Sequence, residues 1–70
     1  MSRSDKVYLQ DIIESIEIIF SYISNKTDFE FSRDLMVQDA IIRRFEIIGE
    51  AASKISEQIK NENPEVQWRL

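Results

Sequence analysis

Two long segments of this chain place apolar residues every three or four positions, which is the spacing of one face of an α-helix. In the first segment the repeating residues are Leu9, Ile12, Ile16, Ile19 and Ile23. In the second they are Ile41, Phe45, Ile48, Ala52, Ile55 and Ile59. One Gly and one Pro among 70 residues leave little for the tight turns of an all-β fold. The spacing therefore predicts an all-α protein.

The first helix is predicted over residues 4–24. Ser4 or Asp5 is the expected cap at its start, because either side chain can accept a hydrogen bond from a free backbone N–H group of the first turn. The apolar stripe is widened by Ile13 and Phe20, whereas Ile18 falls on the opposite side. We therefore expect Ile18 to be exposed or to mark a second contact.

A short helix is predicted over residues 28–32. Thr27 and Glu30 have the spacing of a capping box, in which the two residues satisfy each other's backbone N–H groups. We expect Phe29 and Phe31 to close one end of the core at this point.

A long helix is predicted over residues 34–61, since the residue before Pro64 avoids helical backbone angles. The tail, residues 62–70, is too short for an element of its own, and Trp68 is expected to fold back on a helix or to fit a pocket on a partner. Two long helices with a short connection predict an antiparallel helical hairpin with a short connecting helix.

The long helix carries more apolar surface than one neighbouring helix can cover. It has further apolar residues on both flanks of its stripe, namely Ile42 on one and Ala40, Ile47 and Ala51 on the other. A helix apolar over so wide an arc needs two or three neighbours. Either two copies associate into a helical bundle, or helices of the complete fold are missing from this chain. The predicted oligomer interface is Ile41, Phe45, Ile47, Ile48, Gly49, Ala51, Ala52 and Ile55.

Composition excludes several classes of function. The chain has no Cys and no His, which removes disulfides, thiolate metal sites and the commonest acid–base catalyst at neutral pH. The net charge of −4 argues against an electrostatic nucleic-acid or membrane binder. We expect no cofactor, no metal and no membrane partner, and a cytoplasmic location, because the N-terminus lacks an apolar signal core and acidic residues interrupt the most apolar stretch.

Charged residues on the long helix have a structural and a functional interpretation. Glu46 and Glu50 share one helix face and could form an acid–base or metal-binding pair, but without His we favour a solvated or ion-paired surface. Arg43 and Arg44 could contact phosphate, and we favour salt bridges with the nearby acids. Gly49 inside a helix costs about 1 kcal/mol relative to Ala, which suggests a close approach of another backbone.

Three stretches of the chain resemble one known family. Residues 38–52 read QDAIIRRFEIIGEAA, residues 3–12 read RSDKVYLQDI, and residues 64–69 read PEVQWR. The first run is the most specific. Together they resemble the HepT-like branch of the HEPN ribonuclease superfamily over the whole chain.

This resemblance implies a compact α-helical bundle that dimerises. Members of the family are metal-independent RNA-cleaving toxins of two-gene systems, and a neighbouring nucleotidyltransferase neutralises them by modifying a tyrosine. Their catalytic motif, Arg followed by His-x-Tyr, lies just after the stretch that residues 64–69 resemble. The given sequence stops at Leu70 and has no His, and neither Tyr8 nor Tyr22 lies in a His-x-Tyr context. We therefore carry over no catalytic residue, and we expect residues 1–70 to form a single partial HEPN-like domain.

The resemblance leads to one preferred function and two rivals. The chain resembles the toxin subunit of a HepT/nucleotidyltransferase toxin–antitoxin system, lacks the catalytic half, and is expected to be inactive alone. The alternative is a non-catalytic interaction module that binds a full-length HEPN subunit or the cognate nucleotidyltransferase. A third option is a purely structural helical dimer. The expected partners are a second copy of the chain, with a dimer as the first expectation, and the nucleotidyltransferase antitoxin; RNA is expected only if the missing half is supplied.

Overall fold

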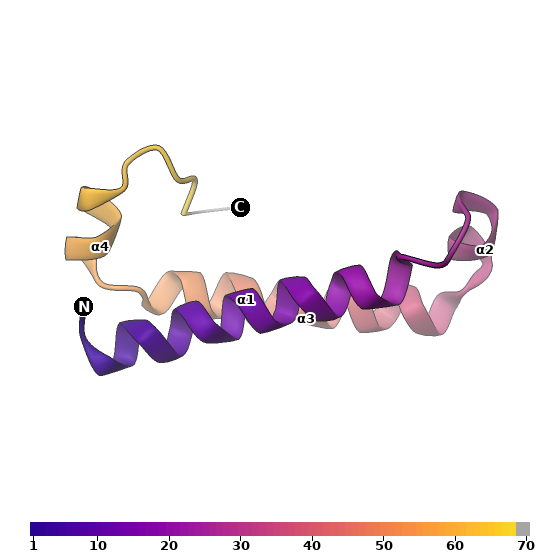
Figure 1. Ribbon diagram of the computed structural model, residues 1–70, viewed down its shortest axis with the longest axis horizontal. Coiled ribbons are helices and arrows are strands. Elements are labelled where there is room, and N and C mark those ends of the chain that lie inside the picture. The colour runs from indigo at the N-terminus through magenta and orange to yellow at the C-terminus, as the bar shows by residue number, and fades with distance from the viewer. Residues whose placement is uncertain (69–70) are drawn as a thin grey trace.

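The computed structural model describes residues 1–68 and contains four α-helices. Their bounds are α1 Arg3–Ile23, α2 Asp28–Arg33, α3 Leu35–Lys54 and α4 Glu57–Glu62. The two long helices α1 and α3 lie side by side and run antiparallel, with α2 joining them at one end and α4 next to the N-terminus at the other (Figure 1). The predicted all-α class and the antiparallel hairpin with a short connecting helix are confirmed. Completion into a bundle by oligomerisation stays a prediction.

The hairpin is elongated for a chain of this length. Its extents are 42 × 22 × 16 Å and its radius of gyration is 14.3 Å, whereas a compact domain of this length has a radius of gyration of about 11 Å. The accessible surface is 5579 Å², against about 4,600 Å² expected for a folded monomer of this mass. The chain therefore exposes roughly 1,000 Å² more surface than a compact domain of the same mass would.

The core lies along the line where α1 and α3 touch. From α3 it contains Ile41 and Ala51, followed by Ile55 just past the helix end, and from α1 it contains Ser15. Ser15 is 1% exposed, and its small side chain leaves room for the opposite helix. Among the described residues, none of the helices is long and apolar enough to cross a membrane.

The contact on α1 is rotated relative to the predicted stripe. Ile16 was expected in the stripe but is 41% exposed, and its neighbour Ser15 occupies the buried position instead. Ile18, expected on the opposite side, is half-buried. The sequence pattern misses this rotation because α1 is apolar on two adjoining faces and only one of them meets α3.

The ends of the first two helices agree only in part with prediction. Ser2 caps α1 by accepting a hydrogen bond from the backbone N–H of Asp5 at 3.0 Å, so the predicted cap at Ser4 or Asp5 is wrong. Ser2 is favoured because its backbone is extended, as a capping residue requires. The capping box is confirmed: the Glu30 N–H donates to the Thr27 hydroxyl at 3.1 Å, and the Thr27 N–H donates to the Glu30 carboxylate at 3.0 Å.

The predicted aromatic closure at α2 is half right. Phe31 is half-buried, but Phe29 is 65% exposed. Residues two apart on a helix point in different directions, so one short helix cannot bury both rings against the same neighbour.

The long helix predicted over 34–61 is broken near its end. Ile55 and Ser56 have extended backbone angles, so α3 ends at Lys54 and α4 begins at Glu57. The apolar spacing continues through Ile55 into Ile59, and it therefore gives no sign of the break. The end of α4 before Pro64 agrees with prediction.

Residues 69 and 70 of the predicted tail lie outside the described residues, and Trp68 folds back on the end of α4, one of the two placements expected for it. The Trp68 indole N–H donates to the backbone carbonyl of Asn63 at 3.2 Å. Beyond α4 the described chain stands away from the long helices (Figure 1).

Candidate functional site

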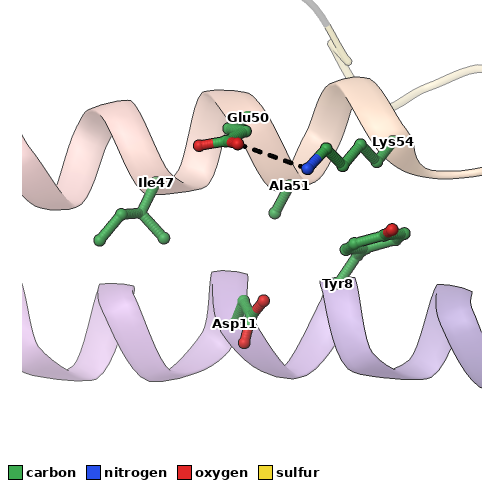
Figure 2. Close-up of a pocket in the computed structure, with 6 residues that line it drawn as sticks. All are labelled: Tyr8, Asp11, Ile47, Glu50, Ala51 and Lys54. Atoms are coloured by element: carbon green, nitrogen blue, oxygen red, sulfur yellow. Dashed lines mark hydrogen bonds and ion pairs between the residues drawn. The ribbon is translucent and has the colours of Figure 1, made fainter.

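A shallow pocket lies on one side of the α1–α3 contact. Its lining residues are Tyr8 and Asp11 from α1 and Ile47, Glu50, Ala51 and Lys54 from α3. Figure 2 shows the Tyr8 ring rising from α1 toward α3, beneath the side chain of Lys54. The volume is about 180 Å³, below the roughly 300 Å³ at which small-molecule sites usually begin.

Two charged side chains of this pocket, Glu50 and Lys54, pair with each other. Lys54 Nζ lies 3.3 Å from Glu50 Oε1 and 5.9 Å from the centre of the Tyr8 ring (Figure 2). Both side chains of the ion pair are more than half exposed, so water screens their attraction. The pocket therefore offers a weakly held ion pair beside a ring, without a buried nucleophile or base.

The acidic pair predicted on the long helix behaves as an ion-paired surface. Glu50 pairs with Lys54, and Glu46 Oε2 lies 3.9 Å from Arg43 Nη1 with both of those side chains exposed. Within the described part of the chain, no group of three or more His, Cys, Asp or Glu side chains is placed to hold a metal ion. The ion-paired interpretation of Glu46 and Glu50 is confirmed.

One carboxylate joins the start of α1 to the segment between α3 and α4. Asp5, 4% exposed, accepts a hydrogen bond from the Ser56 backbone N–H at 2.9 Å and another from the Ser56 hydroxyl at 2.8 Å. Both bonds lower the pKa of Asp5 below its ordinary value of 3.8, and the bond from the backbone N–H has the larger effect. Because Ser56 is also the N-cap of α4, this contact fixes the break between α3 and α4 against the start of α1.

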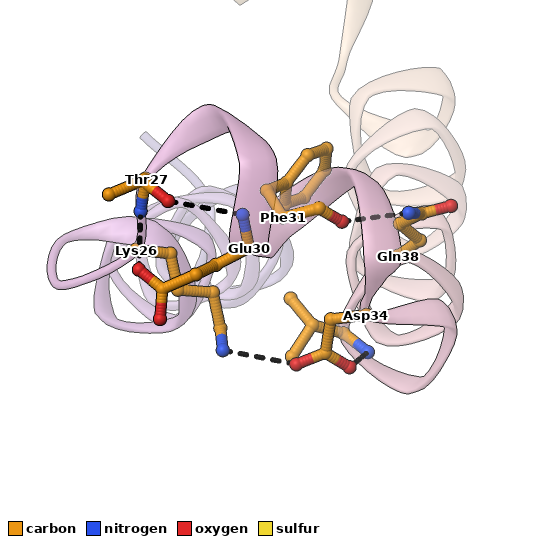
Figure 3. A network of polar contacts seen from close by, with 7 residues as sticks. Lys26, Thr27, Glu30, Phe31, Asp34 and Gln38 are labelled. Atoms are coloured by element: carbon orange, nitrogen blue, oxygen red, sulfur yellow. Dashed lines mark hydrogen bonds and ion pairs between the residues drawn. The ribbon is translucent and has the colours of Figure 1, made fainter.

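A second polar network closes the opposite end of the hairpin. Asp34 caps α3 by accepting from the Val37 N–H at 3.0 Å and also pairs with Lys26 Nζ at 3.0 Å, while the Gln38 amide donates to the Phe31 carbonyl at 2.8 Å (Figure 3). The Val37 N–H, followed by Lys26, lowers the pKa of Asp34. Both effects favour the ionised carboxylate that holds the turn in place.

The Thr27 capping box has the same electrostatic effect. The backbone N–H of Thr27, with help from its hydroxyl, lowers the pKa of Glu30 below its ordinary value of 4.5. Among the described residues, the carboxylates with clearly shifted pKa values are thus Asp5, Glu30 and Asp34, and each of them accepts hydrogen bonds at a helix end. Their shifts are explained by the fold and indicate no acid–base chemistry.

The eight residues predicted as an oligomer interface fall into three groups. Ile41, Ala51 and Ile55 are buried within the chain, and Phe45 is 52% exposed. The half-buried members are Ile47, Ile48, Gly49 and Ala52. The interface itself stays a prediction, and of these eight residues Phe45 offers the largest free apolar surface.

Phe45 is one of several exposed apolar side chains on the two long helices. They are 41% to 63% exposed and come from both long helices; we call them the open apolar face and define it as Ile13, Ile16, Phe20, Ile42 and Phe45.

The five residues lie on one side of the hairpin. On each long helix the buried residues form a line that faces the other helix. At 3.6 residues per turn, the pocket residues Asp11 and Lys54 lie to one side of this line. The residues of the open apolar face lie to the other side. The pocket is lined by both helices, so its two flanks lie on the same side of the hairpin. The α1 residues and the α3 residues of the open apolar face therefore lie next to each other on the opposite side.

Three important residues were missed by the sequence analysis. Asp5 was treated as a helix cap, Ser56 as part of a helix, and Ser15 received no role. Ser15 has a signal in the sequence, since it lies three or four positions from Ile12 and Ile19 in an otherwise apolar row. The Asp5–Ser56 contact joins residues 51 positions apart, and no local pattern predicts it.

Comparison with known proteins gives one family. Residues 12–70 match the family described as Ribonuclease HepT-like. A protein of Thermococcus cleftensis named "Probable ribonuclease HepT" is 44% identical over 69 residues, which are 99% of this chain and 63% of that protein. "Putative RNase MJ0127" of Methanocaldococcus jannaschii is 36% identical over 70 residues, covering 99% of this chain and 58% of that protein.

A third relative has a composite name. "Gamma-glutamylcyclotransferase and putative RNase MJ0434" of Methanocaldococcus jannaschii is 39% identical over 69 residues, 99% of this chain but 31% of that protein. The chain thus spans less than two thirds of the length of each of these relatives. No solved structure gives a significant match.

Proposed function

Because this chain belongs to the HepT-like ribonuclease family, we propose that residues 1–70 provide the helical scaffold of a HEPN-type ribonuclease and not its catalytic groups. The observation that carries this proposal is the structural role of three carboxylates. Asp5, Glu30 and Asp34 each accept a backbone hydrogen bond at the end of a helix. The chain has no His to exchange a proton near neutral pH. Its pocket holds an exposed Glu50–Lys54 pair that water screens.

A cleavage assay tests the proposal. The purified 70-residue chain, incubated with single-stranded RNA in EDTA, is expected to leave the RNA intact. Cleavage that disappears in Tyr8→Phe or Glu50→Gln, variants of the pocket, would contradict the proposal. A contaminating nuclease is recognised because its activity is the same in preparations of both variants.

The toxin role is a further part of this proposal. In this role the antitoxin of the chain is a nucleotidyltransferase, and the pair works in the cytoplasm. The substrate is RNA, once the catalytic half is supplied. The family membership supports this role. Expression of residues 1–70 alone is then expected to leave cell growth unchanged. If expression instead arrests growth, and the nucleotidyltransferase gene reverses the arrest, the chain is toxic by itself and the proposal is contradicted.

The second candidate is a non-catalytic interaction module, and the open apolar face favours it. Soluble monomers seldom leave large contiguous apolar patches uncovered. A module of this kind would bind a longer HEPN subunit or the nucleotidyltransferase through that face. Self-association, with a dimer as the first expectation, is the competing proposal for the same surface.

A further inference from the structure

We propose that the break between α3 and α4 is a hinge with two positions, and that the Asp5–Ser56 contact keeps it bent. When this contact is lost, α3 and α4 join into one continuous helix, and the chain that follows α4 changes direction. The proposed hinge is a conformational device of the hairpin and is independent of any ribonuclease activity.

The backbone at the break is one rotation per residue away from a helix. Ile55 has φ −62° and ψ 140°, and Ser56 has φ −63° and ψ 150°. In an α-helix φ is about −63° and ψ about −42°. Both φ angles are therefore already helical, and only the two ψ angles must change for α3 to continue into α4.

The sequence at the break is compatible with a helix. Neither Gly nor Pro occurs in residues 50–63. Ile55, which is 3% exposed, lies four positions after the buried Ala51 and four positions before Ile59. Residues four apart share one face of a helix. A continuous helix would therefore keep Ile55 on the side that faces α1, so the burial of Ile55 does not require the bend.

Backbone hydrogen bonds favour the straight form. Each helix end leaves four N–H or four C=O groups without a partner inside the helix, and the break creates two such ends, the end of α3 and the start of α4. At the start of α4 the Ile59 N–H reaches only the Ser56 hydroxyl, at 3.4 Å, which is long for a hydrogen bond. Joining the two helices would pair these N–H groups with the carbonyls of α3.

The Asp5 carboxylate opposes this joining. It accepts hydrogen bonds from both the N–H and the hydroxyl of Ser56, at 2.9 and 2.8 Å. In a continuous helix the Ser56 N–H would instead donate to the carbonyl of Ala52, four residues earlier. Few other contacts hold the bend, because α4 packs only slightly against the long helices and is turned away from the axis of α3 (Figure 1). One side chain on α1 therefore selects the position of the hinge.

NMR spectroscopy of the 70-residue chain measures the hinge directly, because the backbone chemical shifts of Ile55 and Ser56 report their ψ angles. In the unchanged chain both residues are expected to show extended values. In Asp5→Ala both are expected to move to helical values. Extended values that persist in Asp5→Ala, or a loss of helical shifts in residues 57–62, would overturn the proposal.

A proline variant distinguishes a hinge from simple loosening of α4. Glu57→Pro places Pro at the first residue of α4, a position where Pro is favourable, and it keeps the preceding Ser56 out of helical angles. The double variant Asp5→Ala with Glu57→Pro is expected to return Ser56 to extended values while residues 58–62 stay helical. Helical values at Ser56 in the double variant would contradict the hinge.

Two further variants keep the test independent of how well Asp5→Ala folds. Ser56→Ala removes one of the two bonds to Asp5 and places the best helix former at the bend, so Ile55 is expected to move toward helical values. An unchanged Ile55 shift in this variant would overturn the proposal.

The matched control is Asp11→Ala, which removes an exposed carboxylate from the same helix. It is expected to leave the shifts of Ile55 and Ser56 unchanged, and a movement as large as that in Asp5→Ala would contradict the assignment to Asp5. Helical shifts throughout α1 and α3 show that each variant is folded.

Discussion

Asp5 and Ser56, 51 residues apart, are joined by two hydrogen bonds of 2.9 and 2.8 Å that tie the start of α1 to the break between α3 and α4. Without this contact, α4 would be attached to the hairpin through little more than the chain itself, because it packs only slightly against the long helices. The contact holds the chain at the point where the long apolar run stops being one helix.

Removing either partner is expected to destabilise the same contact. Ser56→Ala deletes a helix cap and a donor to Asp5, and is expected to cost about 1 kcal/mol of unfolding free energy. Asp5→Ala also lowers the unfolding temperature, and the double variant loses less than the sum of the two single losses. Thermal unfolding followed by circular dichroism measures all three. Additive losses would show that the two residues act independently.

The lowered pKa values predict the response to acid. Since the pKa values of Asp5, Glu30 and Asp34 are lower in the folded chain than their ordinary values of 3.8, 4.5 and 3.8, the folded state binds protons less readily than the unfolded state. The stabilisation is complete above those ordinary values and is lost as the pH falls through the lower folded-state pKa values.

A pH series of unfolding curves checks this sign. The unfolding temperature is expected to change little between neutral pH and about pH 5 and to fall at lower pH. The fall is expected to be shallower in Asp5→Asn, which no longer titrates at that position. An unfolding temperature that rises on acidification, or equal slopes for both chains, would contradict the assignment.

The crossing of α1 and α3 is expected to tolerate only a small residue at Ser15. Ser15→Leu overfills a position that is 1% exposed, and the expected loss is about 1–3 kcal/mol. Ser15→Ala keeps the small volume and is expected to be far milder. The matched control is Ser21→Leu at an exposed position of the same helix, with an effect within about 0.5 kcal/mol. A Ser15→Leu variant as stable as this control would show that the helices do not meet at Ser15.

The capping box is expected to contribute to the stability of the turn. Thr27→Ala leaves the Glu30 N–H without its 3.1 Å bond, and the expected cost is about 1 kcal/mol. Ser32→Ala, which changes an exposed hydroxyl in the same short helix, serves as the control. Chemical denaturation compares the two, and an equal effect would show that the box is dispensable.

Local patterns predicted the two long helices and the short helix α2, but not α4 as a separate helix. The three-and-four spacing predicted both long helices, and the Thr27–Glu30 pair predicted the short one. The spacing could not reveal the break at Ile55 and Ser56, because the apolar row continues through it and Ser56 bonds there to a carboxylate 51 residues away. It also could not choose between the two apolar faces of α1, since the side that α3 covers is decided by packing around Ser15.

The candidate site was harder to predict for a related reason. Apolar residues on α3 were expected to meet a partner, but the same spacing describes residues that meet α1, and Ile41 and Ala51 proved to do so. Only the structure separates the two roles, leaving Phe45 and Ile42 exposed. The contribution of Ile13, Ile16 and Phe20 was missed, because their predicted place was against α3.

Hydroxyl-radical footprinting of the phenylalanines tests most directly that one side of the hairpin is left uncovered. In the 70-residue chain alone, Phe20 and Phe45 are expected to be oxidised readily and the half-buried Phe31 more slowly, in line with their exposure. Strong protection of Phe20 and Phe45 in the chain alone would contradict the account, because it would mean that the open apolar face is already covered.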